Sequence, residues 1–152
     1  MHVKSHAKVS AVSGGLTANL DNNDRFGTAI TYLGDLNFDF VADVAVSSYL
    51  DDDGSSNAGA LFIIYLSAYG TVLSHAKLSS LSGDFTSVLA AEYNFGFSMS
   101  FLGDLNSDGS ADLAVGAFND GDAGTGRGAI YIIFSGLDVG EFSYLKTLLL
   151  LL

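Results

Sequence analysis

The chain of 152 residues contains no cysteine, no proline and no tryptophan. The lack of cysteine excludes disulfides, thiolate metal sites and cysteine nucleophiles. Basic residues are also scarce: 6 Lys and Arg face 17 Asp and Glu, for a formal net charge of -11. A chain this acidic is not expected to bind nucleic acid or anionic membrane through a basic surface.

What the chain does contain is apolar and turn-forming. Hydrophobic residues make up 49% of it, and 18 residues are glycine. Glutamate occurs only at Glu92 and Glu141, so the other 15 of the 17 acidic residues are Asp. Because Asp favours turns and oxygen-ligand loops while Glu favours helices, this bias predicts short strands joined by turns.

The two ends of the chain carry no recognisable targeting or membrane-spanning signal. Residues 1–6 lack the apolar run of a signal peptide. The run Leu148–Leu152 is too short to cross a bilayer, which needs about twenty apolar residues. No membrane span is therefore expected.

The sequence repeats itself at a spacing of 69 residues. Ser5–Lys8 recurs as Ser74–Lys77, and Gly34–Asn37 recurs as Gly103–Asn106. Without a gap, 27 of 62 aligned positions are identical. The chain is therefore predicted to hold two copies of one unit. The boundaries are residues 1–13, which match the end of a preceding repeat, then 14–82 and 83–152.

Each unit shows signals for four strands, and only Phe85–Tyr93 has even a weak helical period. In the first unit the expected strands are Phe26–Leu33, Ala42–Val46, Gly59–Leu66 and Thr71–Leu81. The third is apolar on both faces and should be covered on both, whereas the fourth alternates as an outer strand does. The pattern predicts an all-β fold of tandem four-stranded antiparallel propeller-type blades, open or completed by neighbouring copies. A two-sheet sandwich is the alternative.

An acidic loop separates the first two predicted strands of each unit. Oxygen side chains fall at loop positions 1, 3, 5 and 9, and position 7 can add a backbone carbonyl, which is the ligand spacing of a calcium loop. The candidate ligands are Asp35, Asn37, Asp39, Val41 (carbonyl) and Asp43, and in the second copy Asp104, Asn106, Asp108, Ser110 (carbonyl) and Asp112. About one Ca²⁺ per repeat is predicted.

The alternative for these loops is an ordinary solvated Asp/Asn turn. Comparison of the copies favours calcium, because Phe38 and Ser107 differ at one intervening position while every candidate side-chain ligand is kept. Phe40 stands where the second loop has Gly109, which suits a sharp turn. The first loop should therefore be strained or bend differently, and the second site should bind more tightly.

These motifs resemble the FG-GAP repeat, which forms the blades of the integrin α-subunit head and related extracellular propellers. The second unit carries Phe95-Gly96, Gly103-Asp104, Asp108-Gly109 and Val115-Gly116-Ala117, with Phe118 where the family has proline. The first unit departs further, with Val46-Ser47-Ser48-Tyr49 at the last of these motifs. The resemblance implies four-stranded blades, with a calcium loop between the first two strands and the ligands given above.

Two further polar groups recur with the repeat. Asp51 and Asp53 align with Asp120 and Asp122, and a solvated loop is the expected interpretation, with a second cation site or an interaction edge as the alternative. His6 and His75 are also equivalent, and each has no partner suited to metal binding. Both histidines are expected to be surface or packing residues.

No nucleophile elbow, catalytic triad, zinc site or nucleotide loop is present, so no enzyme is predicted. We predict a calcium-stabilised structural module of an extracellular or cell-surface assembly that binds copies of itself as an oligomer or filament. The alternative is a propeller module for adhesion or glycan recognition within a larger protein, whose partner is an extracellular protein or glycan. The segment Val3–Ser13 matches Val72–Ser82, with another equivalent near Ser143–Leu149. As a strand without a sheet, Val3–Ser13 should pack on a neighbouring unit or on the preceding blade of a longer parent chain.

Overall fold

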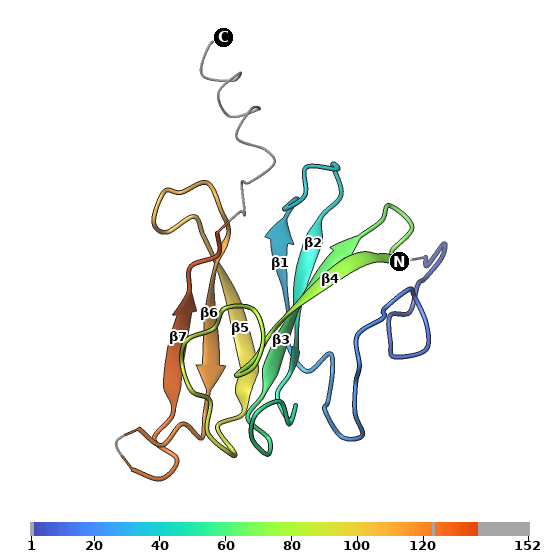
Figure 1. The fold of residues 1–152 in the computed structure, drawn as a ribbon. Helices are drawn as coiled ribbons and strands as arrows, with labels where there is room; N and C mark the ends of the chain where they lie inside the picture. The colour runs from blue at the N-terminus through green and yellow to red at the C-terminus, as the bar shows by residue number, and fades with distance from the viewer. Residues whose placement is uncertain (1, 123, 137–152) are drawn as a thin grey trace.

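The computed structural model describes residues 2–122 and 124–136, which form two antiparallel sheets side by side (Figure 1). The first sheet has the order β1-β2-β3-β4 and the second the order β5-β6-β7. The strands are β1 (Ile30–Gly34), β2 (Asp43–Ser48), β3 (Ala60–Leu66), β4 (Val72–Leu78), β5 (Phe95–Gly103), β6 (Asp112–Ala117) and β7 (Ala129–Ile133). This part of the chain contains no helix, and so none that is long and apolar enough to cross a membrane.

The prediction of an all-β fold is confirmed, and the first sheet is a four-stranded antiparallel blade. The second sheet has three strands among the residues described. The fourth strand expected near Ser143–Leu149 lies outside that range. The weak helical period over Phe85–Tyr93 corresponds to loop and turn.

Two strand boundaries were predicted wrongly. The fourth strand was expected to reach Leu81, but β4 ends at Leu78, after which Ser79 pairs with Ser82 in an isolated bridge. The first strand was expected from Phe26 but begins at Ile30. The chain turns there: the amide of Thr28 donates to the carbonyl of Arg25 (3.2 Å), with Arg25 at φ 60° and Gly27 at φ 91°. The amide of Gly27 still donates to the carbonyl of Ser47 (2.9 Å), but the paired register of β1 begins with Ile30 opposite Val46. The strong β-propensity of the following residues could not reveal that turn.

Strand β3 is covered on both faces, as its apolar sequence predicts. Leu61 belongs to the larger core cluster, which joins the two sheets. Phe62 and Ile64 belong to a second cluster, which Leu16 completes from the N-terminal segment. All three β3 side chains are at most 1% exposed. Burial of one such large side chain contributes about 2 kcal/mol, so β3 is the centre of the hydrophobic core.

The two sheets approach each other so closely at β5 that only glycine fits. A Cβ on Gly59, whose φ is 93°, would lie 2.1 Å from the carbonyl oxygen of Phe95. A Cβ on Gly96 would lie 3.0 Å from side-chain atoms of Leu61 and Ser47. Backbone bonds cross the same contact, where the amide of Phe95 donates to Ala58 and that of Asn94 to Asn57. We call this contact the inter-blade junction.

The N-terminal segment lies on the opposite side of the first sheet from the second sheet (Figure 1). Its residues 2–9 belong to no strand, and residues 2–8 are exposed. Ser10 pairs with Ser13 in an isolated bridge that recurs 69 residues later as Ser79 with Ser82. The local fold at the end of the segment thus repeats that at the end of β4.

Candidate cation loops and a buried aspartate–lysine cluster

The two acidic loops have the same hydrogen-bonded shape. Asp35 lies just after β1, and its carboxylate accepts the amides of Asp39 (3.0 Å) and Phe40 (2.8 Å). In the second loop the carboxylate of Asp104 accepts the amides of Asp108 (3.0 Å) and Gly109 (2.8 Å). A first-position carboxylate therefore curls each loop back on itself.

The middle of each loop repeats as well. Asn37 accepts the amide of Asp39 and donates its own side-chain N–H to the Asp39 carboxylate (2.9 Å). The amide of Val41 donates to the same carboxylate (2.8 Å). Asn106 and Asp108 make the matching bonds in the second loop. Four of the five candidate positions are thus linked by hydrogen bonds within each loop.

The last candidate position has a structural role that the sequence did not reveal. Asp43 is fully buried and accepts the amide of Leu36 (2.9 Å) at the loop start and that of Leu66 (3.0 Å) at the end of β3. Asp112, also fully buried, accepts the amides of Leu105 (2.8 Å) and Ser135 (3.2 Å). Each carboxylate thus links its loop to a backbone amide at the end of β3 or just after β7. This role could have been inferred from the sequence, because in both copies an Asp is the first residue of an apolar strand.

The chemistry of these residues suits a hard cation, because every donor is a carboxylate, amide or carbonyl oxygen. Within residues 2–122 and 124–136, no three Asp, Glu or His side chains converge closely enough to hold a metal ion. The loops are therefore oxygen-lined turns whose carboxylates bond mainly to backbone amides. Calcium binding by them remains a prediction.

Phe40 adopts the backbone angle for which glycine is suited. Its φ is 67°, against 89° for Gly109, and the bonds around the two residues are the same. The sequence suggested that the first loop is either strained or bent differently from the second. The two loops bend in the same way, so the geometry supports strain. The side chain of Phe40 is 98% exposed, so burial of this side chain does not offset the backbone strain. A left-handed non-glycine residue of this kind costs about 1 kcal/mol or more.

Exchanging glycine and phenylalanine between the loops should therefore change stability in opposite directions. Phe40→Gly is expected to raise the free energy of unfolding by about 0.5–1 kcal/mol, since relief of strain exceeds the added backbone entropy of glycine. Gly109→Phe should lower it by about 1–2 kcal/mol. Urea denaturation with a chelator present measures both. Destabilisation by Phe40→Gly would contradict the strain assignment.

Asp51 of the second acidic group is buried, in contrast to the expected solvated loop, whereas Asp53 is half-buried. Asp51 is 2% exposed, and the ammonium of Lys77 on β4 lies 2.8 Å from Asp51 and 2.9 Å from Asp53. Lys77 also lies 5.4 Å from the centre of the Phe62 ring. The three ionic residues line a pocket of about 330 Å³ that also includes Asp24. Asp51, Asp53 and Lys77 are called the aspartate–lysine cluster below.

The charges of this cluster affect one another. The hydrogen bond from Lys77 holds the pKa of Asp53 below its usual value. Burial opposes the charge on Lys77, but the bonds to Asp51 and Asp53 outweigh it and raise the lysine pKa. For Asp24, which is 5% exposed, burial and then the nearby Asp51 raise the pKa. Lys77 thus serves as the counter-ion for an acidic pocket.

In the second unit, tyrosine contacts the equivalent acids. Asp120 is 1% exposed and accepts the hydroxyl of Tyr131, while Asp122 accepts that of Tyr93 (3.4 Å). Burial and the bond to Asp120 raise the pKa of Tyr131. The solvated interpretation is therefore wrong for Asp120 also, whereas Asp122 is exposed.

The two histidines that repeat lie in different surroundings. His75 is on β4 with its ring centre 6.4 Å from that of Phe62, and His6 is exposed. The sequence predicts that both histidines are surface or packing residues, and the structure agrees, with His75 packed and His6 on the surface.

Comparison with known proteins confirms the resemblance. The model of the FG-GAP repeat matches residues 95–133. Over 96 residues, 63% of the chain, it is 38% identical to integrin alpha-2 of Bos taurus. It is 38% identical over 99 residues to integrin alpha-M of Mus musculus, and 39% identical over 99 residues to integrin alpha-PS2 of Drosophila melanogaster. The matched region spans 7–8% of the length of each relative.

Proposed function

We propose that the chain is a non-enzymatic, calcium-stabilised pair of propeller blades in an adhesion-related assembly, extracellular or at the cell surface. The observation that carries the proposal is the recurrence of one loop, with the same hydrogen bonds, at equivalent positions of both units, the second of which lies inside the FG-GAP match. The similarity to integrin alpha chains supports an adhesion role. Of the two functions expected from the sequence, the comparisons thus favour the adhesion module.

Calcium would act on charge and on loop shape. Each loop places three carboxylates within nine residues, and like charges in one tight turn repel. The proposed ligands are Asp35, Asn37, Asp39, Asp43 and the carbonyl of Val41, with the same positions in the second loop. A bound Ca²⁺ would offset the repulsion and fix the connection between the first two strands of each sheet. The chain's own residues contribute the curled backbone that presents these oxygens.

Thermal melting tests this proposal. Modules of this class bind calcium at about 10⁻⁴–10⁻³ M, so a few millimolar calcium should raise the melting temperature by several degrees over a chelated sample. Asp39→Asn combined with Asp108→Asn should remove most of the rise, because Asn keeps an acceptor oxygen but loses the charge. The matched control is Asp84→Asn, an exposed carboxylate outside both loops. The same melting temperature in chelator and in calcium would contradict the proposal.

Self-association is the second candidate function, and apolar exposure favours it. Ile130 on β7 is 73% exposed and Phe134 is 55% exposed. Propellers close with about four to eight blades, so two blades need further ones from the same protein or from other copies. Apolar surface of this kind rarely stays in water.

A further inference from the structure

We propose that the outer face of the second sheet binds the first sheet of another copy of this chain, head to tail, through a contact that repeats the inter-blade junction. This inference rests on the proposed self-association and assigns it to named surfaces. The outer face is Leu102, Ile130 and Ile132. The receiving face is Leu20, Phe26 and Ile30.

The outer face is an apolar surface whose equivalents in the first sheet are covered. Leu102 and Ile130 are 39% and 73% exposed, whereas Leu33 and Leu61, 69 residues earlier, are 4% and 0% exposed. What covers the first sheet is the second sheet, since Leu33 and Leu61 share a cluster with Phe95. Nothing equivalent covers the second sheet in the part of the chain described.

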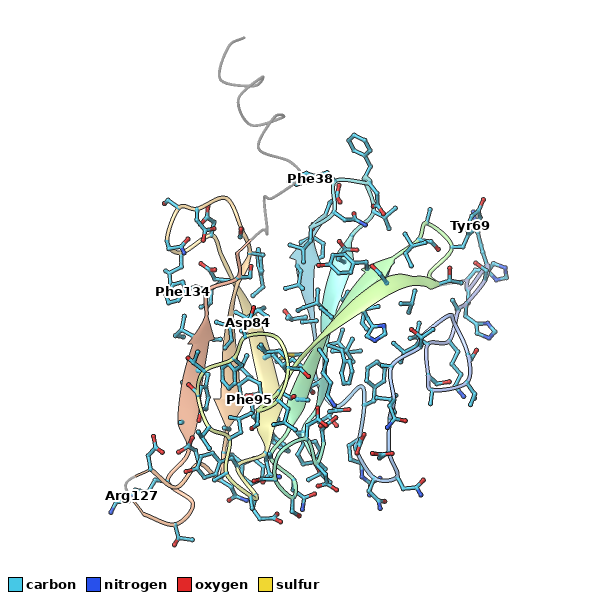
Figure 2. All side chains as sticks on the ribbon, viewed as in Figure 1. Phe38, Tyr69, Asp84, Phe95, Arg127 and Phe134 are labelled. Carbon is cyan, nitrogen blue, oxygen red and sulfur yellow. The ribbon has the colours of Figure 1, made fainter. Side chains whose placement is uncertain are left out.

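The receiving face shows the complementary difference. Leu20 and Phe26 are half-buried and Ile30 is 63% exposed. Their equivalents Leu89 and Phe95 are 1% and 0% exposed against the first sheet. Figure 2 shows Phe95 between the two sheets, which is the environment that Phe26 lacks. A Cβ on Gly27 would meet nothing within 4 Å, although Gly96 is packed against Leu61.

A pocket already exists where the segment at Phe26 would enter. It has a volume of about 490 Å³ and includes Gly116, Ala129 and Ile130 in its lining. Their equivalents Ser47, Ala60 and Leu61 are the residues that hold Gly96 at the inter-blade junction. The pocket on the second sheet is thus the counterpart of the site on the first sheet that Gly96 occupies.

Backbone groups are placed for the same bonds. At the junction the amides of Glu92, Asn94 and Phe95 donate to carbonyls of residues 56–58. The equivalent donors are Asn23, Arg25 and Phe26, and none of them donates to a backbone carbonyl among the residues described. Asn23 (φ 78°) and Arg25 (φ 60°) share the left-handed geometry of Glu92 (φ 66°) and Asn94 (φ 57°). This segment is therefore already shaped for the carbonyls of residues 125–127.

The match between the two faces of this chain indicates another copy as the occupant. Charge does not add to this match: Asp21 stands where the junction has Ala90, but Arg25 stands where it has Asn94, whose amide bonds to Asn57 next to the position of Arg127. These surfaces lie on opposite sides of the described part of the molecule, so a contact between the two faces of different copies can propagate from copy to copy.

Two variants that block opposite faces test the proposal on the full chain. Ile130→Asp blocks the outer face and Ile30→Asp blocks the receiving face, and both side chains are mostly exposed, so folding should persist. Analytical ultracentrifugation in calcium should show assemblies for the unmodified chain and loss of every species above the monomer for either variant alone. An equimolar mixture should give a species of twice the monomer mass, because each variant keeps one intact face. Tyr69→Asp, at the turn between β3 and β4 (Figure 2), removes an 89% exposed aromatic side chain that belongs to neither face and should assemble normally.

Other outcomes overturn the inference. These are an unmodified chain that stays monomeric at all concentrations, variants that assemble normally, or a mixture that forms no dimer. Assembly that is lost on deleting residues 1–13 but kept by both face variants would move the contact to the N-terminal segment. Melting with and without calcium on the same samples separates failure here from failure of the proposed calcium role.

Discussion

Gly59→Ala is expected to lower the free energy of unfolding by about 4 kcal/mol. The new Cβ would lie 2.1 Å from the carbonyl oxygen of Phe95 and 2.7 Å from its nitrogen, and both are backbone atoms. Neither can rotate away, so the sheets must separate at the inter-blade junction. Overpacking of this kind costs about 1–3 kcal/mol or more, and the left-handed angle adds about 1 kcal/mol.

A second glycine separates the cost of the close contact from the cost of the left-handed backbone angle. Gly27 has φ 91°, close to the 93° of Gly59, but has open space where its Cβ would stand. Gly27→Ala should therefore cost only about 1 kcal/mol, measured in urea at protein concentrations where the chain is monomeric. Equal losses from the two variants would show that the close approach of the sheets contributes nothing.

Lys77→Met should destabilise the first sheet by about 2–3 kcal/mol at neutral pH. Methionine can fill the space of the lysine stem, but it leaves the buried carboxylate of Asp51 and its neighbour Asp53 without their shared cation. Breaking a buried pair on one side costs several kcal/mol, and the partial exposure of Lys77 reduces that figure. Adding Asp51→Asn should restore part of the loss, and Lys77→Arg should lose less because it keeps the charge.

The pH dependence of that effect has a definite sign. Lys77 holds the pKa of Asp53 below its unfolded value, so this stability is present above about pH 4 and is lost as the pH falls through the folded pKa. The variant lacks the contribution, and the difference between the two proteins should shrink as the pH falls below about 4. Urea denaturation across this range measures it. A difference that does not change with pH would assign the loss to packing instead.

The repeat made much of the fold predictable. Comparison of the two copies located β3 to within one residue, because its run of apolar residues on both faces has few alternatives. It also separated the oxygen positions of the loops from those that vary. The left-handed turn before β1 was not predictable, since it depends on bonds between Arg25 and Thr28 and on the neighbouring strand.

Burial of Asp51 also escaped the sequence, because it depends on a lysine that follows 26 residues later and reaches it only through the register of β3 and β4. A signal was nevertheless present. Lysine recurs at positions 8, 77 and 146, and the acid recurs at Asp51 and Asp120. When a charged strand residue and an oppositely charged loop residue both recur at the repeat spacing, the two are candidates for an ion pair.

Equilibrium dialysis with labelled calcium at millimolar free concentration measures directly whether these loops bind calcium. Close to two ions per chain are expected, about one after Asp108→Asn, and an unchanged count after Asp84→Asn. The first ion to bind should occupy the second loop, because Gly109 accepts without strain the turn that Phe40 resists. No bound calcium above the level of the doubly substituted Asp39→Asn, Asp108→Asn chain would contradict the account.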